Sequence, residues 1–309
     1  MRRKVVVLGS LNMDLVARVP RMPALGETLA GHGFLQNPGG KGANQAVACA
    51  RQGAQVAMVG CVGDDGFADQ LRASLVQQGV DVTGVRGAPS QATGVAVILV
   101  DDAAQNCIAV VPGANALLGL QDVDAVQPLL ERAALLLLQL EVPIATVLSA
   151  ATLARRCGCR VLLNTAPAQA LPAALWPLLD ILVLNETEAA MYCGLPAVTA
   201  SQAEEAAQQL RRRGPGLVLV TLGADGVVWA GADGTGRMAA PKVQAADTTA
   251  AGDTFIGALA ARLVEGAELR QAVQHAVRAA AICVTRPGAQ ASMPTRAEVE
   301  RFTDLQIVP

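Results

Sequence analysis

The sequence predicts an α/β fold in three layers, with a mostly parallel central sheet flanked by helices. Short, continuous apolar runs alternate with longer helical stretches, as expected for a sheet that is covered on both faces. The residues are 52% apolar but only 2% aromatic, so the core is expected to consist of Ala, Val and Leu. Two stretches, at about 12–37 and 91–112, alternate like strands without an intervening helix.

Each apolar run is expected to form a strand of the sheet, and each helical stretch a helix that covers it. The expected strands are Val5–Leu8, Val56–Val59, Leu135–Leu140, Arg160–Leu163, Ile181–Leu184, Leu217–Val220 and Gly226–Ala230. The expected helices are Ala43–Gln52, Ala68–Gln78, Pro143–Arg156, Gln202–Arg213, Gly252–Glu265 and Leu269–Thr285. One large α/β sheet reaches 309 residues as a unit, so a single domain over 1–309 is expected.

The two stretches without a helix are expected to form a small antiparallel β lid inserted in this domain, at about 12–37 and 91–112. One face of such a layer has no helix to cover it. The lid is therefore expected to cover a ligand or to pair with another copy of itself.

Composition argues against several classes of partner. A formal net charge of −2 provides no broad basic surface for nucleic acid. The longest apolar region, Ala133–Ala154, is interrupted by Glu141 and Pro143, so no membrane span is expected. Val5–Leu8 is too short for a signal peptide, and an odd number of cysteines, seven, suits a reducing compartment. A cytoplasmic protein without a nucleic-acid or membrane partner is expected.

Polar residues follow five of the expected strands. Ligands of open parallel sheets bind beyond the carboxyl ends of the strands, so these residues are candidates for a binding site. They are Ser10, Asn12, Asp14, Glu141, Asn164, Asn185 and Thr221. Their agreement in position favours a site for hydroxyls, phosphates or a metal.

The run Asp247–Asp253 leads into an expected helix through residues with almost no side chain, Ala250, Ala251 and Gly252. Backbone N–H groups at a helix N-terminus can stabilise developing negative charge, and a carboxylate there can accept a proton from an attacking hydroxyl. This combination favours phosphoryl transfer. The structural alternative is that Asp253 is simply an N-cap residue.

Three other polar turns are open to both structural and functional interpretations. Gly39–Asn44 is not a Walker P-loop, but it brings backbone, Lys41 and Asn44 near a small polar ligand. Asn185–Glu188 has the spacing of a capping box, and its carboxylate is also suited to hold magnesium through water. Thr221–Gly226 is either a hairpin loop or a nucleotide contact.

Together these segments resemble the ribokinase family of sugar kinases, also called the PfkB group, from about Val5 to Pro294. The resemblance lies in five motifs in family order and spacing: Gly-Ser-Leu-Asn-Met-Asp at 9–14, Gly-Gly-Lys-Gly-Ala-Asn-Gln at 39–45, Gln-Leu-Glu at 139–141, Asn-Glu-Thr-Glu at 185–188 and Asp-Thr-Thr-Ala-Ala-Gly-Asp-Thr at 247–254. It implies an ATP-dependent kinase that transfers the γ-phosphate to the 5-hydroxyl of D-ribose.

The resemblance also implies a role for each motif. Asp253 would be the catalytic base, and the N–H groups of Ala251, Gly252 and Asp253 would form an anion hole. The sugar would be held by Asn12, Asp14, Gly40, Lys41, Gly42, Asn44, Glu141 and Asp253. ATP would be bound by Asn185, Thr221, Leu222, Gly223, Asp225, Gly226, Gly252 and Asp253, and Glu188 would act on Mg²⁺ through water.

A potassium site and a dimer are implied in the same way. The cation would take the Asp247 carboxylate, the Ser292 hydroxyl, and the carbonyl groups of Thr249, Cys283, Arg286 and Gly288. The lid would form a homodimer.

The chain departs from the family pattern at three positions. Met13 stands where some relatives have Ala beside the sugar, Val277 where relatives often have His or Asn near the adenine, and Pro287 inside the proposed cation loop.

Two alternatives remain on the sequence alone. One is a kinase of the same family for 2-deoxyribose, fructose or adenosine, although the base of a nucleoside calls for an aromatic wall and Phe34 is one of few candidates. The other is a sugar-binding protein without catalysis, which would have no use for the turn before Asp253.

Overall fold

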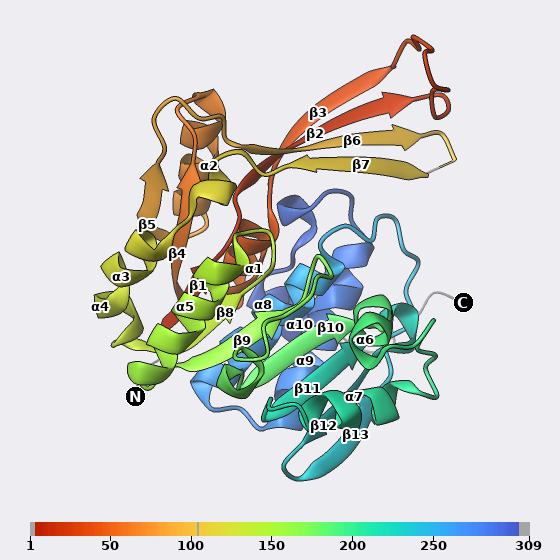
Figure 1. Cartoon of the computed structure of the whole chain (residues 1–309). Helices are drawn as coiled ribbons and strands as arrows, with labels where there is room; N and C mark the ends of the chain where they lie inside the picture. Colours follow the sequence, from red (N-terminus) through yellow and green to blue (C-terminus); the bar gives the residue numbers. More distant parts are fainter. Residues whose placement is uncertain (1–3, 104, 303–309) are drawn as a thin grey trace.

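A computed structural model describes residues 4–103 and 105–302. It confirms the expected fold class, because a large, mostly parallel sheet lies between two layers of helices and a smaller sheet projects from one end (Figure 1). Of the expected 1–309 unit, residues 1–3, 104 and 303–309 lie outside the described residues. Among the described residues, no helix is long and apolar enough to cross a membrane.

Except for β5 (Asp81–Gly87) and β13 (Gly234–Met238), the strands of the large sheet coincide with the apolar runs of the sequence. In spatial order the strands are β13, β12 (Val227–Gly231), β11 (Leu217–Thr221), β10 (Ile181–Asn185), β9 (Arg160–Asn164), β8 (Ala133–Leu138), β1 (Lys4–Leu8), β4 (Gln55–Val62) and β5. From β11 to β5 every pair is parallel, and β12 and β13 turn back as hairpins at one edge. Along β1, Val6 and Leu8 pack into one helix layer and Val5 and Val7 into the other, so the strand is apolar throughout.

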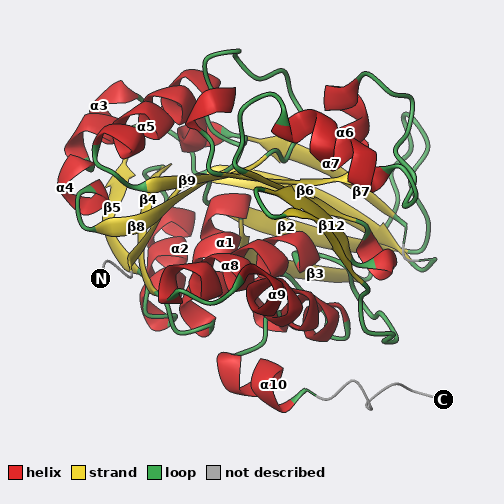
Figure 2. Ribbon diagram, turned by 90° about the horizontal axis from the view of Figure 1, so that it is seen from below, coloured by secondary structure: helices red, strands yellow, loops and turns green. Residues whose placement is uncertain are grey.

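The helices divide between the two faces of the sheet (Figure 2). One face is covered by α3 (Leu120–Ala125), α4 (Gln127–Leu130), α5 (Ile144–Arg156), α6 (Glu186–Cys193) and α7 (Ala203–Arg211). The other is covered by α1 (Lys41–Arg51), α2 (Gly66–Gln77), α8 (Ala251–Glu265), α9 (Leu269–Val284) and α10 (Arg296–Arg301).

The sequence did not predict β5, β13 or the short helices α3, α4 and α10. β5 is an edge strand in which Val85 alone is buried, so it has no continuous apolar run. The three helices have four to six residues, too few for a helical period to be recognised.

The smaller sheet is the lid, with the order β3 (Gly33–Gly39), β2 (Asn12–Val19), β6 (Gly94–Asp101) and β7 (Asn106–Val111). The β2–β3 and β6–β7 hairpins are antiparallel as predicted, and the two hairpins join through the central β2–β6 pair, which is parallel. Both strands begin at the same point, where Asn12 lies opposite Gly94, and run outward together (Figure 1).

Helices α1 and α8 pack closely over the centre of the sheet, and a glycine permits their contact. A Cβ atom added to Gly257 of α8 would lie 2.3 Å from the Cβ atom of Ala48 in α1 and 2.8 Å from the Cys49 nitrogen. The absence of a side chain at Gly257 therefore sets the separation of the two helices.

We expect Gly257→Ala to lower the free energy of unfolding by about 1–3 kcal/mol, although alanine is the better helix former, because the contact is overpacked. Urea denaturation measures this change. Gly66→Ala in α2 is the matched control, since no atom lies within 4 Å of the added Cβ. Gly66→Ala should be neutral or stabilising, and an equal loss in both variants would contradict the prediction.

Candidate active site

Asp253 lies in the first turn of α8, at the carboxyl end of the sheet. The helix begins at Ala251, and its N-cap is Ala250 with a left-handed φ of 59°. Asp253 is therefore the third helical residue and not the N-cap that was its structural alternative. Its side chain is only 8% exposed and points between α8 and α1.

Two amides of α1 hold the Asp253 carboxylate. The Asn44 Nδ2 group donates to Oδ2 at 3.0 Å, and the Gln45 Nε2 group donates to Oδ1 at 2.9 Å. Burial raises the pKa of Asp253 above its usual value, against the opposing effects of Lys41 and the two amides. A carboxylate with a raised pKa accepts a proton more readily, as a general base requires.

The N–H groups before Asp253 are partly available to a ligand. The Ala251 N–H donates to the Thr248 carbonyl at 3.3 Å, whereas the Gly252 and Asp253 N–H groups have no acceptor among the described residues. A Cβ atom added to Gly252 would meet nothing within 4 Å. Two of the three N–H groups expected in the anion hole are thus not engaged by any of the described residues.

Three further charged residues surround this point. Asp14 comes from β2, Lys41 from the start of α1, and Glu141 from the segment after β8. Burial alone would lower the pKa of Lys41, but the carboxylates of Asp253, Glu141, Glu188 and Asp14 raise it. The lysine is therefore firmly cationic at the centre of an acidic group.

The Gly39–Asn44 turn packs directly on the backbone that follows β1. Gly40 has a φ of 87°, and a Cβ atom there would lie 2.7 Å from the Asn12 nitrogen. A Cβ atom on Gly42 would lie 2.6 Å from the Ser10 nitrogen. Neither glycine can be replaced without moving the chain that carries Asn12.

Glu141 connects the Gly39–Asn44 turn to the segment that follows β1. Its Oε2 atom accepts hydrogen bonds from the Ser10 hydroxyl at 2.5 Å and from the Lys41 N–H at 3.0 Å. Asn12 is buried as well, and its Oδ1 atom accepts from the Asn115 Nδ2 group at 2.7 Å. The structure thus brings the predicted residues from 12–14, 40–44 and 141 together next to Asp253.

Sequence reasoning missed four buried amides in this region, those of Gln45, Asn115, Gln139 and Gln290. Gln45 and Gln139 lie inside two of the quoted motifs, and Gln139 is the single polar residue at the end of an apolar run. Those were the available signals. Asn115 and Gln290 lie in short 3-10 turns, Gly113–Leu117 and Gln290–Ser292, which had no sequence signal.

A cavity of about 390 Å³ opens beside the N-terminus of α8. The predicted nucleotide residues Thr221, Gly223, Gly226 and Gly252 line it. Its apolar wall includes Phe255 of α8, and Val277, Ala280, Ala281 and Val284 of α9. Asn185, Leu222 and Asp225 do not line it, although Asn185 lies opposite Thr221 in the β10–β11 pair. The volume and the apolar wall suit a small ligand with a flat ring system.

Asn185 and Glu188 form the capping box of α6. The Asn185 side chain accepts from the Glu188 N–H at 2.8 Å, and a Glu188 oxygen accepts from the Asn185 N–H at 3.0 Å. Thr165 also donates to Glu188 at 3.3 Å. Burial raises the pKa of the Glu188 carboxyl. The structural interpretation of this motif is therefore confirmed.

The residues of the predicted cation loop converge. The Asp247 carboxylate accepts from the Thr249 N–H at 2.9 Å and from the Gly288 N–H at 2.8 Å. Cys283 Sγ lies 3.0 Å from the Ser292 hydroxyl and 3.8 Å from the Thr249 carbonyl oxygen. Burial opposes ionisation of Asp247, but these hydrogen bonds outweigh it and hold its pKa below the usual value.

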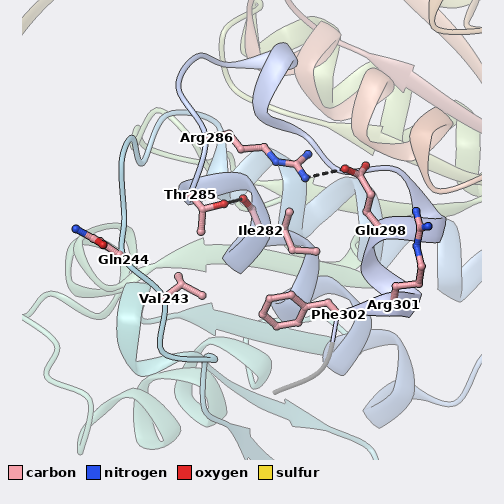
Figure 3. A pocket seen from close by; sticks show the side chains of 8 residues that line it. All are labelled: Val243, Gln244, Ile282, Thr285, Arg286, Glu298, Arg301 and Phe302. Atoms are coloured by element: carbon pink, nitrogen blue, oxygen red, sulfur yellow. Dashed lines mark hydrogen bonds and ion pairs between the residues drawn. The ribbon is translucent and has the colours of Figure 1, made fainter. Parts of the chain in front are cut away.

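The Arg286 side chain is directed away from this loop. Figure 3 shows that it lines a second cavity, which has a volume of about 590 Å³. There the Arg286 guanidinium forms an ion pair with Glu298 of α10 at 2.7 Å. Phe302 and Ile282 line the same cavity. With the guanidinium engaged there, the main-chain carbonyl is the part of Arg286 left for the loop.

Comparison with known proteins places the chain among sugar kinases. The model of the pfkB family carbohydrate kinases matches residues 2–296. The chain is 40% identical to a ribokinase of Haemophilus influenzae, over 98% of this chain and 99% of that protein. It is 38% identical to a deoxyribokinase of Salmonella typhi, over 97% of each. The structure of Arabidopsis thaliana ribokinase complexed with ribose and ATP superposes with a TM-score of 0.90 at 32% identity, covering 98% of this chain and 100% of that chain.

The electrostatics of Asp14 lead to a prediction for the chain without ligands. Burial, and secondarily the like charges of Glu141 and Asp253, raise the pKa of Asp14 to about 7. The folded state therefore binds this proton more tightly than the unfolded state, in which the pKa is about 3.9. Asp14 consequently destabilises the fold as the pH rises from about 4 to 7.

We expect Asp14→Asn to raise the free energy of unfolding at pH 8 by on the order of a few kcal/mol, and to change it little at pH 4. Urea denaturation at both pH values measures the difference. Asp233→Asn, at an exposed turn, serves as the control. An effect of Asp14→Asn that does not depend on pH would contradict the prediction.

Proposed function

The chain belongs to the pfkB family of carbohydrate kinases, and we propose that it phosphorylates D-ribose at the 5-hydroxyl with ATP as donor. It is an ATP-dependent sugar kinase; the choice of ribose is the proposal. The observation that carries it is the buried Asp253 carboxylate at the N-terminus of α8, between the charged residues Asp14, Lys41 and Glu141 and the cavity of about 390 Å³.

The proposed reaction uses both sides of this helix terminus. Asp253 accepts the proton of the 5-hydroxyl as that oxygen forms a bond to the γ-phosphorus. The bond from the γ-phosphorus to the bridging oxygen breaks, and ADP leaves with those electrons. The N–H groups of Gly252 and Asp253 stabilise the charge on the transferred group, and Ala251 contributes less because its N–H already binds Thr248.

We assign the sugar hydroxyls to the cluster of polar residues at the start of the lid. Carboxylates accept hydrogen bonds from neighbouring hydroxyls, whereas amides both donate and accept. The residues assigned are Asn12, Asp14, Gly40, Lys41, Gly42, Asn44 and Glu141. Of these, Glu141 and Asn44 also organise the site itself, because they hold the Lys41 backbone and Asp253.

We assign ATP to the cavity beside α8. Thr221, Gly223 and Gly226 would contact the nucleotide along one side, and Val277 would lie against the adenine. The remaining residues of the nucleotide proposal, Asn185, Leu222 and Asp225, would act from the strand end and the hairpin turn, in which Leu222 N–H donates to the Gly226 carbonyl at 2.8 Å.

Two cations complete the proposal. Glu188, whose oxygens already accept hydrogen bonds, would hold Mg²⁺ through water, and the metal would neutralise phosphate charge. The described residues contain no cluster of three or more His, Cys, Asp and Glu side chains suited to a metal. The proposed potassium site offers carboxylate, hydroxyl and carbonyl oxygens, which are the donors that a hard cation prefers. Its residues are Asp247, Thr249, Cys283, Arg286, Gly288 and Ser292.

We further propose a cytoplasmic homodimer that forms through the lid. The lid, at about 12–37 and 91–112 of a single domain, exposes a series of large apolar side chains. They are Phe34, Leu35, Val97, Ile108, Val110 and Val111. An uncovered apolar sheet of this kind is favourable to bury against a second copy.

We expect Asp253→Asn to lower the turnover number with ribose by about 10²–10⁴, because the base is lost while its shape remains. The dissociation constant of ATP should change little. Steady-state kinetics and calorimetric titration with ATP measure the two quantities, and Asp233→Asn is the control. Full turnover of Asp253→Asn with ribose would refute the assignment of the base.

Substrate and cation are tested together by ADP release with ribose, 2-deoxyribose, fructose and adenosine, each with and without potassium. We expect the highest kcat/KM with ribose, and stimulation by potassium that Asp247→Asn abolishes. The 38% identity to a deoxyribokinase makes 2-deoxyribose the second candidate. A preference for 2-deoxyribose would overturn the ribose proposal alone. A rate that does not depend on potassium would overturn the proposed potassium site at Asp247.

A further inference from the structure

Two buried glutamines lie behind the amides that hold Asp253. Gln139, which follows β8, donates from Nε2 to the Gln45 Oε1 atom at 2.7 Å. Gln290, in the turn Gln290–Ser292, donates from Nε2 to the Asn44 Oδ1 atom at 3.2 Å. Gln139 and Gln290 are 0% and 7% exposed. Each oxygen of the Asp253 carboxylate is therefore the end of a chain of two amides. The Gln45 Nε2 group also donates to the Asn164 Oδ1 atom at 3.1 Å, so Asn164 helps to hold this amide.

The direction of hydrogen bonding in both chains follows from the chemistry of the carboxylate. An ionised carboxylate only accepts hydrogen bonds, so Asn44 and Gln45 must each present an NH₂ group to Asp253. The carbonyl oxygens of these two amides then point away and need donors. Gln290 and Gln139 supply those donors, and the reversed amides would aim two oxygens at the carboxylate.

We propose that Gln139 and Gln290 are positioning residues that set the orientation of the Gln45 and Asn44 amides and so keep the buried Asp253 ionised and aligned. This inference rests on the proposed role of Asp253 as the base. Among the described residues, the amide NH₂ groups of Gln139 and Gln290 donate to Gln45 and Asn44 and not to Asp253, so each glutamine acts through its amide partner.

The surroundings of Gln139 support a role beyond its own packing. Its Oε1 atom is buried and has no hydrogen-bond partner in the part of the chain that the structure describes, which is destabilising. The same atom would lie 1.9 Å from a Cβ atom on Gly9, so a glycine is needed there. The oxygen of Gln139 thus makes no favourable polar contact, and its NH₂ group is the part of the side chain that has a hydrogen-bond partner, Gln45.

The Gln290 chain reaches Asp253 from a different part of the molecule. Gln290 lies between Gly288 and Ser292 of the proposed cation loop, and its Oε1 atom accepts from the Ser74 hydroxyl at 3.5 Å. Asn44 thereby links this loop to the base on α8. The two chains come from separate elements, so their effects can be measured independently.

The charged and titratable groups that face Asp253 do not belong to either chain. They are Asp14 of β2, Lys41 of α1 and Glu141 after β8, with the Cys283 thiol of α9 near the neighbouring Thr254. Replacement of a glutamine by methionine, which is neutral and of similar size, leaves all of these groups in place. A change in the titration of the reaction then reports the lost amide orientation.

The test measures the rate of the first turnover, by rapid quenching before the steady state, at saturating ribose and ATP from pH 5 to 9. Because the base must be ionised, the rate rises with pH. We expect Gln139→Met and Gln290→Met each to move this rise upward by roughly one pH unit, with a loss that approaches tenfold on the acid side of the rise and is recovered at high pH. Gln52→Met is the matched control, since Gln52 is equally buried but donates to the Pro294 carbonyl.

A pH-independent loss in both variants, or an equal shift in Gln52→Met, would overturn the proposal and leave only a packing role. Circular dichroism and thermal denaturation identify a variant that fails to fold, and the other glutamine then supplies the test. Asp253→Asn distinguishes a wrong assignment of the base from a wrong assignment of the positioning residues. If it reacts at full rate, the proposed base is wrong; if it is slow while the glutamine variants do not shift, only the positioning role is wrong.

Discussion

The arrangement of the site depends on one interaction, the attachment of a buried carboxylate on α8 to two amides on α1. A carboxylate that is 8% exposed stays ionised only if its oxygens are hydrogen-bonded. Asn44 and Gln45 meet this need only when α1 and α8 are closely packed, which Gly257 permits. The ionisation of Asp253 therefore depends on the close packing of α1 against α8.

The same helix terminus faces two compartments. On one side, the charged residues Asp14, Lys41 and Glu141 lie around Asp253. The turn at Gly40 and Gly42 packs closely against the backbone after β1. On the other side, the cavity wall is mainly apolar. A polar compartment and an apolar compartment that share one set of N–H groups are what a transfer between a sugar and a nucleotide requires.

Much of the fold was predictable, because buried parallel strands such as β1 must be continuous apolar runs. The edge strand β5 was not, since burial does not dictate its composition. The position of the reactive residue was also predictable, because Asp253 follows three residues with almost no side chain. Its amide supports were not predictable, because Asn44 and Gln290 are 246 positions apart and no sequence pattern links them. An isolated glutamine has no characteristic neighbours in sequence.

The sequence by itself determined the α/β class, the lid, and the set of strand-end residues that form the site, since periodicity and composition are local properties. Only the tertiary structure decided that Asp253 is the third residue of α8, that Glu188 is engaged in a capping box, and that β2 pairs with β6 in parallel. It also decided which amide faces which oxygen. These features depend on contacts between distant segments, and hydrogen-bond direction follows from the whole network and not from any one residue.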